Sequence, residues 1–209
     1  MKRRAIKKVC VQAEFGFFLM ICLFLLMDFG GMGGMCLAAV CLHEAGHLAV
    51  LFFLGEQIRE IRFCFGGIRI EREENLSLRG EAAVHLSGPC ANLCAALCLF
   101  ESGNLPFSAV HCALGLFELC PLPSLDGGQA LFCALQRRIS LQSAQKICKK
   151  VSAVTLALAF LAGCILLFLQ QNAGLLILWL LLLLQETEKG TKKRLLFTAS
   201  FVALYLFYS

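Results

Sequence analysis

Residues Met35–Leu54 read MCLAAVCLHEAGHLAVLFFL, and this stretch decides the fold. It is about as long as the roughly 20 apolar residues that a helix needs to cross a lipid bilayer. Its only ionisable side chains belong to His43, Glu44 and His47, apart from two cysteines. Because such groups cost several kcal/mol in hydrocarbon, their presence indicates a functional site inside a membrane helix.

The composition of the whole chain is that of a membrane protein. Of its 209 residues, 59% are hydrophobic and 16% are charged, against roughly 45–50% and about 25% in a soluble domain. The sequence predicts an all-α polytopic membrane protein with six transmembrane helices, or seven if residues 195–208 form a full span. We expect one membrane-embedded domain over residues 1–209. The other apolar stretches cover residues 15–27, 82–100, 107–121, 151–169, 173–184 and 195–208.

The positions of the charges predict the topology. The 19 basic residues fall into four clusters, within residues 2–8, 59–79, 137–150 and 189–194. Positively charged loops stay in the cytoplasm, so the N-terminus and all four clusters are expected there. Basic residues that gather on the cytoplasmic side of a lipid bilayer account for the net charge of +5. We therefore predict no nucleic-acid partner.

A basic run before an apolar stretch is also typical of a secretory signal peptide. No small-residue cleavage pattern follows Met27, so we expect the first helix to be retained. The 13 cysteines lie mostly inside apolar runs, where cysteine behaves as a small hydrophobe. We therefore expect a multi-pass protein of the cell membrane, without a disulfide framework.

The pair His43 and His47 has the spacing of a metal site. Side chains four residues apart lie on one face of a helix, so both imidazoles can bind one zinc ion. Glu44 lies about 100° around the same helix, where its carboxylate can take a proton from water beside the metal. The alternative of two core histidines around a buried glutamate is hard to sustain in an apolar span.

A third zinc ligand must come from another segment, because catalytic zinc sites usually have three protein ligands. The best candidate is Asp126 in the segment PLPSLDGG, residues 121–128. Gly127 and Gly128 permit tight backbone geometry beside it. The alternative is a helix-terminating turn in which Asp126 caps the next helix.

Three motifs together resemble the site-2 protease family of intramembrane zinc metalloproteases. They are HEAGH at 43–47, GPCAN at 88–92 and LDGG at 125–128, and their order matches across a catalytic core of residues 35–130. The resemblance implies one zinc ion per chain on His43, His47 and Asp126, with Glu44 as the catalytic base and Asn92 near the substrate.

The size of the chain looks most like the small sporulation-type branch of this family. That resemblance implies a bacterial protein whose substrate is a membrane-associated precursor, such as a sporulation sigma factor, and a membrane-protein regulator. Residues 151–209 match only as C-terminal transmembrane helices.

Glu118 is a departure from the family pattern. Where many members have asparagine in a Phe-Asn-x-x-Pro segment, this chain reads Phe117-Glu118-Leu119-Cys120-Pro121. We expect Glu118 to be protonated and to replace the amide as a neutral hydrogen-bonding group near the substrate.

Residues 56–80 are expected to form a β-hairpin on the cytoplasmic side. Two alternating stretches, 61–65 and 68–72, flank Gly66-Gly67, a strong signal for a two-residue turn. Phe63, Phe65, Ile68 and Ile70 would share one face. The hairpin either pairs with an extended substrate or is a plain interfacial element, and the sequence leaves both open.

The weaker signals have plainer interpretations. Cys90, Cys94 and Cys98 recur on one helix face, where we expect small residues for helix packing rather than a metal site. His85 and His111 are expected to be polar packing residues rather than ligands.

Two other classes of protein were weighed against a protease. A metal-ion transporter would repeat acids and histidines over several spans and show internal repeats, and the sequence has neither. A catalytically silent scaffold would not need an intact HExxH motif with Asp126.

Overall fold

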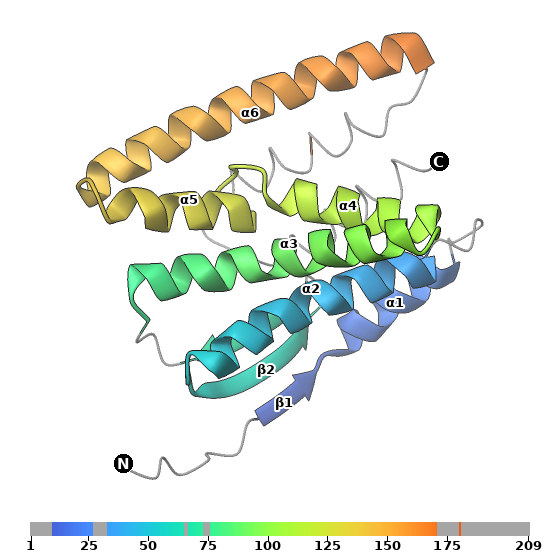
Figure 1. The fold of residues 1–209 in the computed structure, drawn as a ribbon, viewed down its shortest axis with the longest axis horizontal. Helices are drawn as coiled ribbons and strands as arrows, with labels where there is room; N and C mark the ends of the chain where they lie inside the picture. The colour runs from blue at the N-terminus through green and yellow to red at the C-terminus, as the bar shows by residue number, and fades with distance from the viewer. Residues whose placement is uncertain (1–9, 27–32, 65–66, 73–75, 171–179, 181–209) are drawn as a thin grey trace.

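The structure is a computed structural model, and it describes residues 10–26, 33–64, 67–72, 76–170 and 180. Six helices make up most of this part (Figure 1). They are α1 (Phe15–Leu26), α2 (Gly33–Phe53), α3 (Leu78–Glu101), α4 (Leu105–Glu118), α5 (Asp126–Gln136) and α6 (Leu141–Gln170). The predicted stretches at 173–184 and 195–208 lie almost entirely outside the described residues.

Three of the described helices are long and apolar enough to cross a membrane: Gly33–Phe53, Leu78–Glu101 and Leu141–Leu169. The expected span at 107–121 is instead the 14-residue helix α4, which is shorter than the roughly 20 residues of a full span. It ends at Glu118 because the chain turns there into the proline-containing segment before α5. The count of six or seven spans remains a prediction.

Helix α3 is the centre of the packing, since it contacts α2, α4 and α5 (Figure 1). A buried cluster of Cys36, Ala39, Val40, Val110 and Leu114 joins α2 to α4. The contacts of α3 use the side that carries Val84, Gly88, Asn92 and Ala96. The three cysteines predicted to pack are exposed, so that prediction was wrong for the described helices, because those cysteines lie on the opposite side of α3.

The predicted hairpin is present as β2 (Ile58–Cys64) and β3 (Gly67–Arg72), which pair antiparallel. The predicted turn at Gly66-Gly67 was wrong by one residue, because Gly67 pairs with Cys64 and belongs to β3. Phe63 lies opposite Ile68, and Ile61 lies opposite Ile70. Partners that lie opposite each other share a face, so Ile61 and Ile70 do. The common face of Phe63, Phe65, Ile68 and Ile70 remains a prediction, because Phe65 and the side chain of Ile68 lie outside what the structure describes. Arg72 anchors the hairpin to α3 through an ion pair with Glu81 at 2.5 Å.

A third strand, β1 (Cys10–Ala13), was not predicted from the sequence. It pairs in parallel with β2, so the sheet order is β1-β2-β3. The prediction of an isolated two-stranded hairpin was therefore incomplete. Because β2 is paired on both sides, only the outer edges of β1 and β3 are unpaired within the described sheet.

Helix α6 begins about ten residues before the predicted span at 151–169. Ser140 lies just before it and accepts a hydrogen bond from the backbone N–H of Ser143 at 3.3 Å, a common way to start a helix. The basic residues of the cluster within 137–150 lie on its first turns and just after the end of α5, where they are exposed. They are Arg137, Arg138, Lys146, Lys149 and Lys150.

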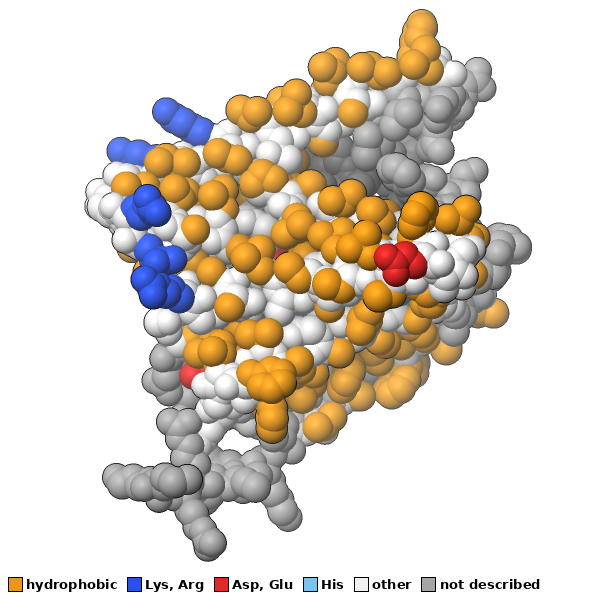
Figure 2. Space-filling model, viewed as in Figure 1, with side chains coloured by type: hydrophobic (Ala, Val, Ile, Leu, Met, Phe, Trp, Pro, Cys, Tyr) orange, Lys and Arg blue, Asp and Glu red, His pale blue; other side chains and the backbone are white. Residues whose placement is uncertain are grey.

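Charge and hydrophobicity are segregated on the surface. Figure 2 shows basic side chains gathered at the end where α5 turns into α6, and apolar side chains spread along the helices. Leu97 on α3 is 67% exposed and Phe168 on α6 is 89% exposed. Large apolar side chains in such numbers on the helix surfaces fit a lipid environment rather than water.

Candidate active site

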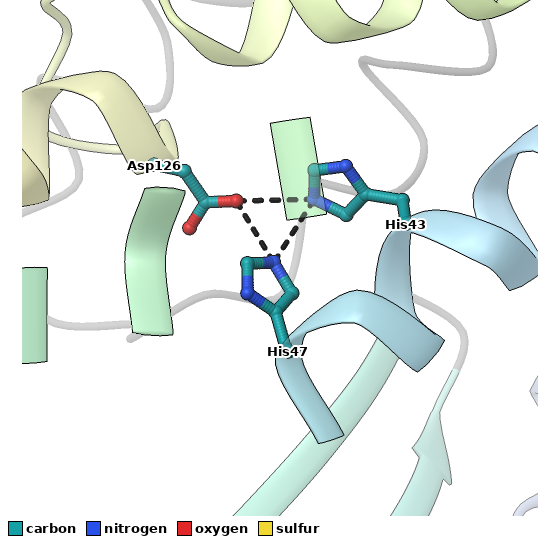
Figure 3. A group of neighbouring side chains, drawn as sticks. All are labelled: His43, His47 and Asp126. Atoms are coloured by element: carbon teal, nitrogen blue, oxygen red, sulfur yellow. Dashed lines mark hydrogen bonds and ion pairs between the residues drawn. The ribbon is translucent and has the colours of Figure 1, made fainter. Parts of the chain in front are cut away.

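His43, His47 and Asp126 converge on one point between α2 and α5 (Figure 3). Oδ2 of Asp126 lies 3.0 Å from Nε2 of His43 and 3.0 Å from Nε2 of His47. The two Nε2 atoms are themselves 3.0 Å apart. Asp126 thus meets two histidines that precede it by 79 and 83 positions in the sequence (126 − 47 and 126 − 43), as expected for a third ligand from the LDGG motif.

The donor set of this cluster fits a zinc ion. Two imidazoles and one carboxylate are the ligands of many catalytic zinc sites, which leave a fourth position open. Three atoms that all accept a metal or a proton face one another here, in a partly buried site on an apolar helix. A shared cation would satisfy all three atoms at once.

Gly88 on α3 makes room for the cluster. A Cβ atom at this position would lie 2.5 Å from Nε2 of His47 and 2.7 Å from Nε2 of His43. Any side chain here would therefore enter the space into which both ligand nitrogens point. The glycine of the GPCAN motif is required by this close approach of α3 to the two imidazoles.

His47 is oriented by the backbone of α3. Its Nδ1 lies 2.7 Å from the carbonyl oxygen of Val84, which accepts only if Nδ1 carries the proton. That tautomer leaves the lone pair on Nε2, directed toward the cluster. The Ser87 hydroxyl donates to the same carbonyl at 2.6 Å.

Asp126 is held from two sides. Its second oxygen, Oδ1, lies 3.0 Å from Nδ1 of His85, so a third histidine contacts the carboxylate without joining the ligand group. The residue begins α5 and Leu125 is the N-cap, without a side-chain cap bond. The alternative in which Asp126 caps the helix is therefore wrong, because its carboxylate faces the histidines.

The two glycines after Asp126 are needed for the turn that delivers it. A Cβ atom on Gly127 would collide with the carbonyl oxygen of Leu119, and one on Gly128 with the carbonyl oxygen of Leu122. The prediction that these glycines permit tight backbone geometry is confirmed. Buried Leu122 and Leu125 pack with Phe117 and Leu156 under this turn.

His43 has a buried polar partner on its far side. Its Nδ1 lies 3.3 Å from Nδ2 of the Asn92 amide, and Oδ1 of the same amide lies 3.0 Å from Nδ1 of His111 on α4. Asn92 is fully buried, and His111 is 3% exposed. The structure therefore brings Asn92 into contact with a cluster histidine; its expected nearness to the substrate remains a prediction.

The two predicted acids occupy different places. Glu44 is half-buried on α2, close enough to His47 for its charge to act on that imidazole. Glu118 is 6% exposed at the end of α4 and does not belong to the metal-ligand group found among the described residues. Their roles as base and substrate contact remain predictions.

Sequence reasoning underestimated His85 and His111. His85 precedes Gly88 by three positions and Asn92 by seven, so all three lie on one face of α3. That spacing could have linked His85 to the GPCAN motif. For His111 the sequence offers only a polar residue in an apolar helix, and its contact with Asn92 depends on how α4 packs against α3.

Comparison with known proteins agrees with this geometry, although no family model matches the chain. Stage IV sporulation protein FB of Bacillus subtilis (strain 168) is 30% identical over 164 residues, 72% of this chain and 56% of that protein. The chain thus spans a little over half the length of this curated relative.

A solved structure, the site-2 protease from Methanocaldococcus jannaschii, shares the fold with a TM-score of 0.55 at 18% identity. The match covers 100% of this chain and 94% of the other. The chain is thus similar in sequence to a sporulation protein and in fold to a site-2 protease, and its HEAGH, GPCAN and LDGG motifs meet at one site.

Proposed function

We propose that this protein is an intramembrane zinc metalloendopeptidase that cleaves membrane-associated precursor proteins. The observation that carries the proposal is the convergence of His43, His47 and Asp126 at 3.0 Å. The two histidines and Glu44 lie on α2, which is long and apolar enough to cross a bilayer. A structural role alone does not account for this combination, because each group is costly in hydrocarbon.

The roles of the side chains follow from their positions. His43, His47 and Asp126 would hold a zinc ion, which would supply the Lewis acid for the scissile carbonyl and for the attacking water. Glu44 takes a proton from the attacking water and passes it to the amide nitrogen that leaves, so the peptide C–N bond breaks as the C–O bond forms. Val84 and His85 keep His47 and Asp126 in position.

We place the cleavage near the cytoplasmic face. His43 precedes Gly55 by 12 residues (55 − 43), which at about 1.5 Å per residue sets the metal about 18 Å from that end of α2 at most. The helix itself ends two residues before, at Phe53, and Gly55, with a φ of 71°, lies in the turn that follows. The basic residues of α5 and α6 support the same orientation, with the N-terminus and the released product in the cytoplasm.

The substrate would bind as an extended strand, because a peptide bond in a helix is shielded from attack. The outer edge of β3 (Gly67–Arg72) is the best position for it, since β2 is already paired on both sides. Main-chain hydrogen bonds to an open sheet edge are a common mode of peptide recognition. By resemblance to the sporulation-type branch, we propose a sigma-factor precursor as substrate and a membrane protein as regulator.

Metal analysis of the purified protein and of its His43→Ala variant tests whether the proposed ligands bind zinc. We expect about one zinc ion per chain in the wild type and its loss in the variant. Several metal ions per chain would favour the alternative of a metal-ion transporter. A tagged precursor co-expressed with the wild type should then give a shortened cytoplasmic product that Glu44→Gln does not give; a product found only outside would overturn the orientation.

A further inference from the structure

A pocket of about 310 Å³ lies between α5, the start of α6 and the loop that joins α4 to α5. Its volume is at the lower end of the range of small-molecule sites, roughly 300–1,000 Å³. None of the three metal ligands lines it, so it is separate from the metal cluster. Its lining combines apolar and polar side chains, among them Pro121, Pro123, Phe132, Gln129, Gln145 and Lys149.

The charge around this pocket is of one sign. Residues 127–170 contain five basic residues, all within 137–150, and no Asp or Glu. All five are exposed, and none forms an ion pair with a residue that the structure describes. Asp126, the nearest acid in the sequence, turns its carboxylate toward the metal cluster. The pocket therefore lies in a field that attracts an anion.

The sequence of α6 places the pocket at a membrane surface. Lys149 and Lys150 are the last charged residues of this helix, and the 20 residues that follow (170 − 150) carry no charge. That is about the length of helix that crosses a bilayer, so Lys149 lies at the level of the lipid headgroups. Exposed apolar side chains begin about one turn further on, with Val154 at 59% and Leu158 at 62%.

Two polar groups of the lining are available to a ligand. Gln145 and Lys149 lie one helical turn apart on the same face of α6, and neither has a hydrogen-bond partner in the part of the chain that the structure describes. Gln129 differs, because its amide donates to the carbonyl of Pro123 at 2.5 Å and ties α5 to the loop. An ammonium and a carboxamide N–H are both donors that suit the oxygens of a phosphate.

We propose that this pocket binds the phosphate headgroup of an anionic phospholipid, with the ammonium of Lys149 on the phosphate and the acyl chains along the apolar length of α6. A phospholipid matches both halves of the observation, the positive charge at the pocket and the apolar surface beyond it. A free phosphate matches only the first half. The inference goes beyond the proposed protease activity and does not depend on bound zinc.

The test is the binding of palmitoyl-oleoyl phosphatidylglycerol to the purified full chain in a nonionic detergent, followed by native mass spectrometry at about 0.15 M salt. We expect saturable binding of one lipid and a higher temperature of thermal unfolding in its presence, because the ligand contacts only the folded state. Phosphatidylcholine with the same acyl chains should bind about fivefold more weakly, since its choline cation opposes the basic cluster. Inorganic phosphate at the same concentration should not displace the lipid.

Lys149→Gln and Lys150→Gln are matched variants, because each removes one positive charge from an exposed residue and of the two only Lys149 lines the pocket. Lys149→Gln should bind phosphatidylglycerol about tenfold more weakly, since it loses a charge-assisted hydrogen bond. Lys150→Gln should stay within about threefold of the wild type, since a charge that acts only through the field is screened by salt. Lys149→Arg keeps charge and donors and should also stay within about threefold.

Equal losses of affinity in Lys149→Gln and Lys150→Gln would overturn the inference, because they would show a diffuse attraction to the surface. It would also be overturned by a wild type that binds no phosphatidylglycerol, by equal affinity for phosphatidylcholine, or by displacement with inorganic phosphate. His43→Ala should bind the lipid as the wild type does. A chain that binds phosphatidylglycerol but no zinc would thus contradict the proposed function and leave the lipid site standing.

Discussion

The imidazole of His85 and the carboxylate of Asp126 form a pair in which Nδ1 lies 3.0 Å from Oδ1. The other oxygen, Oδ2, is the atom that faces His43 and His47. His85 thus fixes which oxygen of Asp126 points into the cluster. Asp126 also begins α5, where the positive end of the helix dipole favours a carboxylate.

The first prediction concerns this pair. His85→Ala should lower the affinity for zinc about 10- to 100-fold, the usual cost of losing an outer hydrogen bond to a ligand, because Asp126 is then free to rotate. Competition with a chromogenic chelator measures the affinity. Leu86→Ala, at the neighbouring exposed position on α3, is the control, and equal zinc affinity in both variants would remove any role for His85.

The ligands of the site could be predicted from the sequence, whereas their supports could not. HExxH is a local pattern, since two histidines four residues apart meet by helix geometry alone. His85 and His111 reach Asp126 and Asn92 only because α3 packs against α5 and α4. Such contacts depend on tertiary structure, which apolar periodicity does not encode.

The errors in the fold have similar causes. Strand β1 is four residues long and pairs with β2, with Cys10 opposite Glu60. The two strands are far apart in the sequence, so no local pattern indicates their pairing. Lys146, Lys149 and Lys150 precede the predicted span at 151–169, yet they belong to the same helix, because an exposed turn of a long helix accommodates lysines well. The hairpin, apart from the exact position of its turn, was predicted because turn and strand signals are both local.

The second prediction separates metal binding from proton transfer. Glu44→Gln should retain zinc and abolish cleavage, because an amide cannot accept the proton of water. Asp126→Ala should instead lose zinc, since it removes one of three ligands. Zinc content by mass spectrometry and cleavage of a tagged precursor measure the two effects, and near-normal cleavage by Glu44→Gln would show the assigned base to be wrong.

The third prediction concerns Glu118, which is 6% exposed. If it acts as a neutral hydrogen-bonding group, Glu118→Gln should keep most of the activity, while Glu118→Leu should lose about tenfold or more by removing a buried hydrogen bond of about 1–3 kcal/mol. Zinc content should stay unchanged in both variants. Equal cleavage rates in the glutamine and leucine variants would remove any role for this side chain in the reaction.

The last prediction uses Gly88, whose added Cβ would lie 2.5 Å from Nε2 of His47. Gly88→Ala should lose zinc, because both imidazoles must move away from the methyl group. The helix itself should not suffer, since alanine is favoured over glycine in a helix by roughly 1 kcal/mol. Thermal unfolding without metal should therefore stay near that of the wild type.

Gly34→Ala is the matched control for this change. It adds the same methyl group to a helical glycine of α2, where no described atom lies within 4 Å, so zinc content and cleavage should be unaffected. If Gly88→Ala bound zinc as the wild type does, the two histidines could not share a metal in the arrangement of Figure 3. A loss of zinc in both variants would point instead to a general effect of alanine on the packing of these helices.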